Sequence, residues 1–294
     1  MAKRLLLILN PISSKMTGKK HLADVLEQFC RADYLPTVHV TTARGDGRAV
    51  AATYGGEADL VVCLGGDGTF NEVVTGLLEA GHTTPIGYIP CGSTNDFAAG
   101  IGLKKTVPAA TAAILGGTPH TYDVGVFGER YFSYVASFGI FTRASYATPQ
   151  NVKNALGHLA YVLEGMKELS NIRPWHARIT VDGATVEGDY LFGAVSNATS
   201  VGGVLNLDPK AVDMNDGRLE LLLVKMPRTA TELSECIVAL AEQRYDTPAI
   251  TFMSGADFTV EADPAMEWTL DGEWAHGAES VHITNRHNAI TLIH

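Results

Sequence analysis

The stretch Leu60–Glu72, LVVCLGGDGTFNE, runs from an apolar segment into a glycine-rich turn and then toward a helical pattern. A short apolar run of this kind is typical of a strand buried on both faces. Gly65, Gly66 and Gly68 allow the backbone to turn sharply and to approach a ligand closely. The N–H groups of such a turn, together with the N-terminus of the helix behind it, attract anions. The stretch therefore predicts a strand–turn–helix unit that holds a phosphate group.

Asp67 lies inside this turn. A carboxylate there would repel phosphates unless a divalent cation lay between them, so Asp67 is a candidate for contact with Mg²⁺. The alternative is a tight turn in which Asp67 caps a helix. The Lys-Ser/Thr ending of a Walker A loop is missing, which excludes that motif.

The flanking sequence repeats the same alternation of strand and helix. Strands are expected at Arg4–Leu9, Thr37–Thr41, Leu60–Leu64 and Ile86–Ile89, with helices between them at Leu22–Cys30, Arg48–Tyr54 and Asn71–Ala80. This alternation predicts a parallel sheet with crossover helices. Because ligands of open parallel sheets lie beyond the carboxyl ends of the strands, Asn10–Ser14, Thr41, the Gly65 turn and Gly92–Phe97 should gather at one edge.

The pattern changes after about residue 120. Two helical signals remain, at Val152–Ser170 and Thr231–Gln243. The other apolar stretches are β-rich and are separated by turn signals such as Asp182-Gly183 and Asp271-Gly272. We therefore predict an α/β fold with two domains. Residues 1–125 form a parallel-sheet nucleotide-binding domain to which residues 285–294 return, and residues 126–284 form a mostly antiparallel, β-rich domain.

Composition limits the classes of function. The 294 residues carry a net charge of −10, which argues against nucleic acid as a partner. The four cysteines form no closely spaced pair, so we expect reduced thiols rather than a zinc or disulfide framework. The apolar run Leu5–Leu9 is too short for a membrane span or a signal peptide, which indicates a cytoplasmic protein. Residues 1–50, with eight Lys or Arg against four Asp or Glu, are the most basic part.

Four motifs, taken in order, resemble those of one enzyme family. They are Asn10-Pro11, the run GGDGTFNE at Gly65–Glu72, the run GSTNDF at Gly92–Phe97, and Asp271-Gly272-Glu273. In this order they resemble the diacylglycerol kinase family of lipid kinases, above all its bacterial soluble branch, which is related to sphingosine and ceramide kinases. The diglycine motif alone is shared with NAD kinases and phosphofructokinases, and the resemblance implies a nucleotide-binding domain similar to theirs.

The resemblance implies ATP as a cofactor and assigns roles by position. The glycine turn and the positions that match the family's ATP-binding residues together give the predicted ATP site. Its residues are Asn10, Pro11, Ile12, Ser13, Ser14, Thr41, Gly65, Gly66, Asp67, Gly68, Thr69, Phe70, Asn71, Glu72 and Ser93. Ser14 stands where the family usually has glycine. Glu273 matches the family's catalytic base, and we add Asp67 as a second catalytic residue because of its place in the phosphate turn.

A metal site is also implied. Asp213, Asp216 and Arg218 match a structural Mg²⁺ site of the family, with Arg218 contributing its carbonyl oxygen. An oxygen cage of this kind suits a hard cation. The alternative interpretation of the segment is an Asx-type hairpin turn.

The implied activity is ATP- and Mg²⁺-dependent phosphorylation of the primary hydroxyl of a diacylglycerol-like lipid, giving a phosphatidate-type product. Transient peripheral contact at the inner face of the membrane is expected, because no strong membrane anchor is present. The helix at Val152–Ser170 either lines an acyl-chain groove or packs in the core. Two other functions stay open, namely a NAD kinase-like enzyme for a soluble substrate and a non-catalytic nucleotide- or lipid-binding regulator. The oligomeric state stays open too, a homodimer included.

Overall fold

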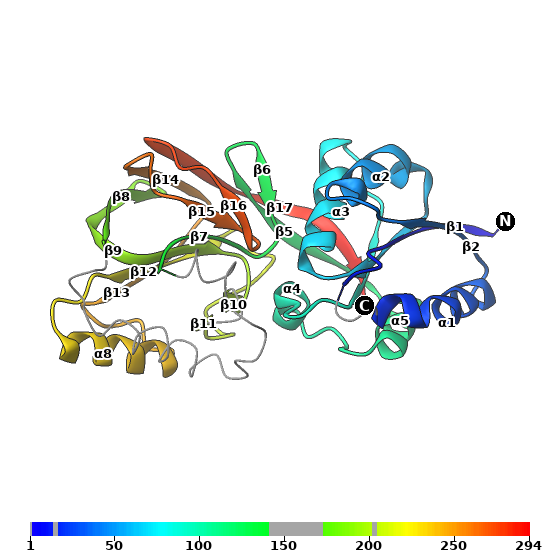
Figure 1. Cartoon of the computed structure of the whole chain (residues 1–294), viewed down its shortest axis with the longest axis horizontal. Coiled ribbons are helices and arrows are strands. Elements are labelled where there is room, and N and C mark those ends of the chain that lie inside the picture. Colours follow the sequence, from blue (N-terminus) through cyan, green and yellow to red (C-terminus); the bar gives the residue numbers. More distant parts are fainter. Residues whose placement is uncertain (1, 14–16, 141–172, 202–204) are drawn as a thin grey trace. The chain divides into compact units, whose positions relative to one another are not determined.

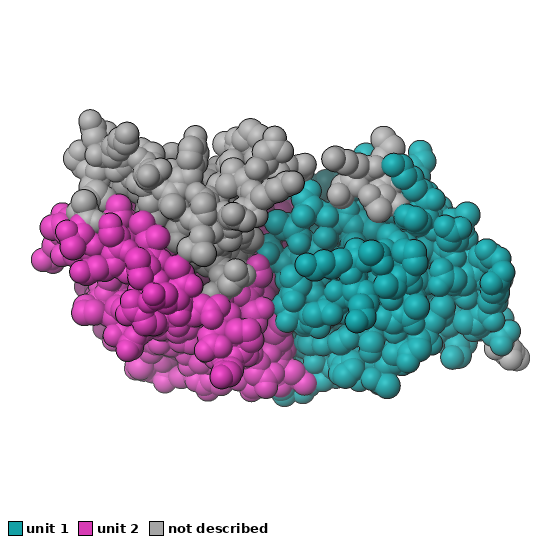
Figure 2. All heavy atoms as spheres, turned by 90° about the horizontal axis from the view of Figure 1, so that it is seen from below, with its two compact units in different colours: residues 1–124, 287–294 teal, residues 125–286 magenta. Residues whose placement is uncertain are grey.

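The computed structural model describes residues 2–13, 17–140, 173–201 and 205–294, and the chain divides into two compact units (Figure 2). Unit 1 consists of residues 1–124 and 287–294, and unit 2 consists of residues 125–286. Strands β5 (Pro119–Phe127) and β17 (Ser280–Ile293) each supply residues to both units. Unit 2 is therefore an insertion in the sequence of unit 1.

Unit 1 is built on a parallel sheet. Its strand order is β2 (Tyr34–Val40), β1 (Lys3–Leu9), β3 (Leu60–Gly65), β4 (Ile86–Pro90) and then the end of β17. Every residue of β3 and β4 is buried, because both faces of the sheet are covered. At the far side of β4, Leu292 of β17 pairs in parallel with Ile86.

Helices cover both faces of this sheet (Figure 1). The helices α2 (Asp46–Tyr54) and α3 (Asp67–Glu79) lie on one face, and α1 (Thr17–Arg31) and α5 (Val107–Gly116) lie on the other. The stripe that predicted α1 is realised by Val25 and Phe29, which pack in the core with apolar residues of β1 and β3. Two short elements complete the unit, a 3₁₀ turn at Gly55–Glu57 and helix α4 (Asp96–Gly100) after β4.

Unit 2 is antiparallel. Its main strand order is β16 (Glu273–Ala275), β15 (Trp268–Leu270), β7 (Val135–Gly139), β9 (Ala184–Ser196), β8 (Trp175–Val181), β14 (Asp257–Ala262) and β17, while β12 (Leu219–Lys225) pairs with β9 and with β13 (Ile250–Gly255). Three short strands complete it, β6 (Arg130–Phe132), which pairs with β5, and the pair β10 (Ser200–Val201) and β11 (Leu205–Asn206).

The core and the one described helix of unit 2 follow from local sequence. Trp268 is 1% exposed, and its ring meets Phe127 and Phe138 edge-on. Helix α8 (Ala230–Ala241) begins after the N-cap residue Thr229, whose hydroxyl accepts a hydrogen bond from the Glu232 N–H. The Glu232 carboxylate in turn accepts one from the Arg228 N–H.

The predicted fold class is confirmed, with a parallel-sheet first part and an antiparallel, β-rich second part. Helix α3 begins at Asp67 instead of at Asn71, because Gly66 occupies the N-cap position and the motif itself forms the first turn. Among the described residues, the helices and strands that the sequence pattern missed are α4, α5, β5, β10, β11, β13 and β16. The predicted helix at Val152–Ser170 lies outside the described residues. Within the described part of the chain, none of the helices is long and apolar enough to span a membrane.

Gly76 allows α2 and α3 to approach closely. A Cβ atom there would lie 2.2 Å from the Arg48 carbonyl oxygen and 3.0 Å from the Ala51 Cβ. We expect Gly76→Ala to lower the free energy of unfolding by about 1–3 kcal/mol, since the helices must move apart. Denaturant unfolding measures this. Gly116→Ala is the control, because no atom lies within 4 Å of its Cβ position, and it should not destabilise. Equal stability of the Gly76 variant and wild type would contradict the close contact.

Candidate functional site

The carboxyl ends of the parallel strands of unit 1 lie at one edge. The Thr41 N–H donates to the Leu9 carbonyl at 2.9 Å, and the Cys91 N–H donates to the Gly65 carbonyl at 2.7 Å. Asn10 follows β1 directly, at the same edge. The structure therefore brings together the segments after β1, β2, β3 and β4, which carry the predicted ATP-binding residues of unit 1.

Asn10 joins the first motif to the glycine turn. Its Nδ2 donates to the Thr69 hydroxyl at 3.0 Å, and its Oδ1 accepts from the Ile12 N–H at 3.1 Å. The Ser13 hydroxyl donates to the Asn10 carbonyl at 2.9 Å. Asn10 thus organises the turn after β1 instead of pointing away from it. Ser14, the departure from the family pattern, lies outside the described residues.

Asp67 joins the glycine turn to the motif after β4. Its two carboxylate oxygens accept from the N–H groups of Asp96 at 3.1 Å and Phe97 at 3.4 Å, at the start of α4. The backbones are close as well, because a Cβ on Gly66 would lie 2.9 Å from the Gly92 Cα. Asp67 therefore acts as a cap, but of α4 rather than of its own helix. Its contact with Mg²⁺ stays a prediction.

Glu72 fixes the loop that follows Thr41. Its carboxylate oxygens accept from the Gly45 N–H at 2.7 Å and from the Gly47 N–H at 3.0 Å. These donors lie at the N-terminus of α2, where a negative charge is favoured by the helix dipole. Spacing along the sequence gave no sign of this pairing, because residues 45 and 72 are 27 positions apart.

Phe70 anchors the turn from below. Its ring is fully buried, stacks on Tyr88 at 4.5 Å and lies tilted against Phe97 at 4.6 Å between ring centroids. Phe70 as a whole is buried, so its role here is to pack beneath the turn. The predicted ATP-site residues that reach the surface at least in part are Asn10, Pro11, Ile12, Ser13, Gly66, Asp67, Gly68, Asn71, Glu72 and Ser93, whereas Thr41, Gly65, Thr69 and Phe70 are buried.

In unit 2, Glu273 follows a tight hairpin turn between β15 and β16. Asp271 and Gly272 have φ angles of 49° and 82°, and Leu270 pairs with Glu273 across the hairpin. Two successive positive φ angles are the mark of a type I′ turn, which the Asp-Gly sequence favours. The turn gives the Glu273 carboxylate a defined place on the surface of unit 2, with 37% of the side chain exposed.

Asp271 is a structural acid. It is 7% exposed, and its carboxylate accepts hydrogen bonds from the N–H groups of Ser133 at 2.5 Å, Tyr134 at 3.0 Å and Val135 at 3.0 Å. A carboxylate whose oxygens accept three backbone hydrogen bonds has few lone pairs left to accept a hydrogen bond from a substrate. Between the two acids of this turn, Glu273 is the one that solvent reaches.

Arg130 is a neighbour of Glu273 that the sequence pattern did not reveal. Its Nη2 lies 3.9 Å from Glu273 Oε2, and its Nη1 donates to the Trp274 carbonyl at 3.3 Å. The residue begins β6, in the hairpin that follows β5. The Glu273 carboxylate therefore has a cation beside it, and the exposed indole of Trp274 lies next along the chain.

The loop before β12 carries the predicted metal ligands. Asp213 Oδ1 accepts from the Asn215 N–H at 3.0 Å, and Asp216 Oδ1 accepts from the Arg218 N–H at 2.9 Å. Both are Asx turns, so the alternative interpretation of the segment describes its local geometry. The guanidinium of Arg218 is held elsewhere, by Asp182 at 3.1 Å. No cluster of three or more His, Cys, Asp or Glu suited to a metal occurs among the described residues.

A buried acid lies beside this loop. Glu220, in β12, is 1% exposed, and its Oε2 has no hydrogen-bond partner among the described residues. Burial, followed by the negative charge of Asp216, raises the pKa of Glu220 to about 8. The described residues thus do not gather a donor set for Mg²⁺ around this acid, and the metal site stays a prediction.

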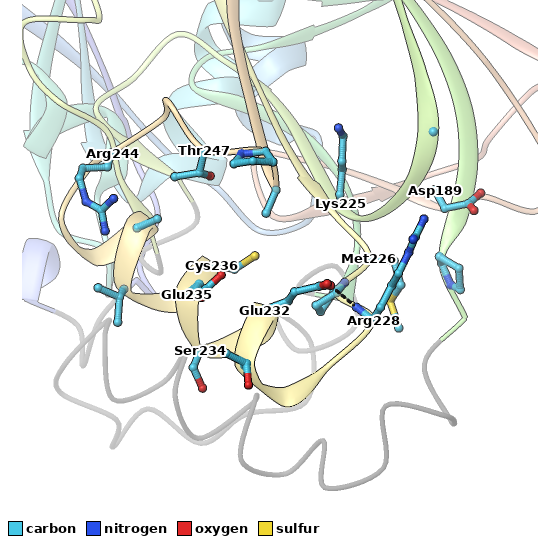
Figure 3. Close-up of a pocket in the computed structure, with 18 of the residues that line it drawn as sticks. Asp189, Lys225, Met226, Arg228, Glu232, Ser234, Glu235, Cys236, Arg244 and Thr247 are labelled. Carbon is cyan, nitrogen blue, oxygen red and sulfur yellow. Dashed lines mark hydrogen bonds between the residues drawn. The ribbon is translucent and has the colours of Figure 1, made fainter.

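The pocket in Figure 3 lies elsewhere in unit 2. It has a volume of about 1170 Å³ and is lined by α8 and by residues before and after it, with Lys225, Arg228 and Arg244 alongside Glu232. Both signs of charge face it, and the Glu232 carboxylate is used to cap α8. None of the predicted catalytic, ATP-binding or metal residues that the structure describes lines this pocket.

Comparison with known proteins gives one consistent result. Residues 4–127 match the family described as the diacylglycerol kinase catalytic domain, and residues 134–294 match the YegS C-terminal NAD kinase beta sandwich-like domain. A diacylglycerol kinase of Bacillus subtilis strain 168 is 35% identical over 274 residues, which cover 92% of this chain and 90% of that protein. One of Staphylococcus epidermidis strain RP62A is 31% identical over 281 residues, covering 93% and 87%.

The fold has a counterpart among solved structures. A crystal structure from Bacillus anthracis strain Sterne, provisionally named a diacylglycerol kinase, superposes with a TM-score of 0.83. The two chains are 23% identical, and the match covers 99% of this chain and 97% of the other. At this identity the likeness concerns the fold, which extends over both units.

The hydrogen bonds of Asp271 predict its effect on stability. Asp271→Asn keeps the size of the side chain and its tolerance of positive φ, but it replaces an acceptor oxygen by a donor. We expect the free energy of unfolding to fall by about 1–3 kcal/mol, because a buried N–H loses its partner. Thermal or denaturant unfolding measures the loss.

Asp33→Asn is the matched control, since Asp33 also has a positive φ, of 62°, but is exposed. Its stability should stay close to that of wild type. If both variants were as stable as wild type, the three hydrogen bonds of Asp271 would carry no net stability.

Proposed function

The chain belongs to the diacylglycerol kinase family, and on that basis we propose that it is an ATP-dependent lipid kinase. Its substrate is diacylglycerol or a related lipid with a primary hydroxyl, and its product is of the phosphatidate type. Transient contact of the protein with a membrane surface, where such a lipid resides, is part of the proposal.

The observation that carries the proposal is that hydrogen bonds connect the segments at the carboxyl ends of the parallel strands of unit 1. The Asn10–Thr69 and Asp67–Asp96 hydrogen bonds hold three motifs around the start of α3. The exposed Gly68 lies in the first turn of that helix, where backbone N–H groups have no partners within the helix. Such a turn suits phosphate oxygens. We assign the ATP phosphates to it, with Ser13 and Ser93 as neighbouring hydroxyls.

Phosphoryl transfer depends mainly on positioning and on neutralising charge. Glu273 accepts the proton of the lipid hydroxyl while the oxygen of that hydroxyl forms a bond to the γ-phosphorus of ATP. The bond between the γ-phosphorus and the oxygen that bridges it to the β-phosphate breaks, which releases ADP. Arg130, beside Glu273, orients the carboxylate. A bound Mg²⁺ would neutralise phosphate charge, and Asp67 is the carboxylate of the turn that is suited to hold it.

The first test is transfer of label from γ-labelled ATP to an extractable lipid. Mixed micelles of diacylglycerol with Mg²⁺ are incubated with wild type or with Glu273→Gln. We expect labelled phosphatidate from wild type and at least about 100-fold less from the variant, since loss of a general base typically costs this much. Glu279→Gln is the matched control, because Glu279 is an exposed acid of the same unit.

The outcomes separate the parts of the proposal. Equal labelling by Glu273→Gln and wild type would keep the kinase and reject Glu273 as base. Label that enters NAD instead of lipid, when both are offered to wild type, would identify a soluble-substrate kinase. ATP binding without transfer to any acceptor would favour a regulator.

A second test concerns Asp67. Asp67→Asn retains one acceptor for the start of α4 but removes the negative charge. We expect its affinity for ATP to fall roughly tenfold with Mg²⁺ present and to change little with EDTA, as the loss of a metal contact requires. Equilibrium binding of a fluorescent ATP analogue measures both affinities, and Asp24→Asn, an exposed site on α1, is the control. An equal fall in both buffers would leave Asp67 with its capping role alone.

A further inference from the structure

Strand β2 carries a large share of the exposed apolar surface. Among the described residues, seven large hydrophobic side chains are exposed, and three of them, Leu35, Val38 and Val40, lie in this one strand. Their exposed fractions are 65%, 36% and 42%. Single apolar side chains scattered over a surface are ordinary, whereas a group of them on one element marks an interaction surface. The strand therefore has the side chains of an interface.

The backbone of β2 is also open along one side. It is the outermost strand of the unit-1 sheet, and among the described residues it pairs with β1 only (Figure 1). The Lys3 N–H donates to the carbonyl of Asp33, just before β2, at 2.9 Å. The N–H of Thr41, just after β2, donates to the Leu9 carbonyl at 2.9 Å. The odd-numbered residues of this stretch therefore turn their backbone groups toward β1, and residues 34, 36, 38 and 40 turn theirs outward.

The edge has little protection against a further strand. Soluble proteins commonly protect edge strands with charged side chains, above all lysine, with bulges or with proline. Residues 34–43 of this chain contain no Lys, Arg, Asp or Glu, and the register of β2 with β1 runs without a bulge. Pro36 is the one protective residue in β2, and it removes a single outward N–H.

The strand is complementary to a second copy of itself in the antiparallel direction. With Val38 opposite Val38 of the other copy, each donates its outward N–H to the other's carbonyl. Pro36 then lies opposite Val40, so the Pro36 carbonyl accepts the Val40 N–H, and the Val40 carbonyl at the end of the ladder is left to water. Pro36, Val38 and Val40 share one face of the strand, so both copies add apolar side chains to the same face. In this register no charged side chains of β2 oppose each other.

We propose that β2 is the interface of a homodimer of this protein, in which it pairs antiparallel with β2 of a second copy about a twofold axis at Val38. The sheets of the two copies then form one continuous sheet. Twofold symmetry is the commonest symmetry of protein dimers, and it requires a self-complementary surface of this kind. A second copy is favoured over a foreign strand because the same residues supply both sides of the apolar face. The inference is independent of the kinase reaction, since β2 contains none of the residues assigned to ATP, lipid or metal.

The first test is sedimentation equilibrium of the full chain from about 1 μM to 1 mM. One strand gives a contact at the small end of protein interfaces, so we expect a dissociation constant of about 1–100 μM for the wild-type dimer. Val38→Lys places two like charges opposite each other at the axis and should raise this constant at least about tenfold. Val38→Pro removes both central N–H donors but no hydrogen bond to β1, and it should also raise the constant about tenfold or more.

The matched control is Val238→Lys, because Val238 is a valine with a similar exposed fraction, 47%, in helix α8 of unit 2. It should dimerise as wild type does. Thermal unfolding at a concentration where wild type is monomeric should give all three variants nearly the wild-type midpoint. If the proline variant does not fold, Val38→Lys carries the test alone.

The second test concerns the register. Val38→Cys and Leu35→Cys are each made with Cys30→Ser, because Cys30 is an exposed thiol. Cα atoms of two paired Val38 residues would lie about 5.5 Å apart, which a disulfide spans. Two Leu35 residues would lie six positions apart along the ladder, roughly 20 Å, which a disulfide does not span. Mild oxidation should therefore give a covalent dimer of the Val38→Cys protein and leave the Leu35→Cys protein monomeric on a denaturing gel.

Three results would overturn the inference. The first is a wild-type protein that stays monomeric over the whole concentration range. The second is a dimer whose dissociation constant neither Val38 variant changes, since another surface would then hold it. The third is equal cross-linking at positions 35 and 38, which a defined register excludes. Because no kinase activity is measured, failure of the proposed lipid phosphorylation would not affect these outcomes.

Discussion

The close approach of the backbone at Gly66 to that at Gly92 is the constraint on which the nucleotide edge of unit 1 depends. A Cβ on either residue would lie within 3 Å of the other's Cα, so the ends of β3 and β4 meet only because both side chains are absent. Their meeting places the start of α4 where the Asp67 carboxylate reaches it. The turn after β3 is thereby held in shape before any ligand arrives, which reduces the entropy lost when phosphates bind.

Acidic side chains hold much of this structure together. Asp67, Glu72 and Asp271 each accept hydrogen bonds from two or more backbone N–H groups that are distant in sequence. A carboxylate can satisfy several donors at once, and bonds to a charged acceptor are stronger than neutral ones. These three acids therefore connect segments of the chain that are distant in the sequence. Asp271 is buried, whereas Asp67, Glu72 and Glu273 are each partly exposed, so exposure alone does not separate the acids that connect segments from the proposed base.

The parallel part of the fold was predictable because its strands are short apolar runs that end in glycine or proline, as at Leu60–Leu64 and Ile86–Ile89. Helix α3 was placed four residues late because Asp67 and Gly68 are weak helix formers that an N-terminal position nonetheless accommodates. Strand β13 was not predicted because its residues, ITFMSG, do not alternate between buried and exposed positions, and the sequence therefore lacks the period-two pattern of a half-buried strand. The partners of Glu72, Asp271 and Glu273 escaped because they depend on contacts between residues from 25 to more than 130 positions apart, which local patterns do not encode.

The interrupted sequence of unit 1 has a consequence for synthesis on the ribosome. Its sheet is completed by Leu292 beside Ile86, and the two residues are separated by the whole of unit 2. Until residues 287–294 emerge, β4 has an open side with unpaired backbone groups, whereas unit 2 is already complete at residue 286. Domains generally fold as units, in the order in which their segments become available. Unit 2 is thus the first unit whose residues are all available for folding. The sheet of unit 1 can be completed only later, when β17 pairs with β4.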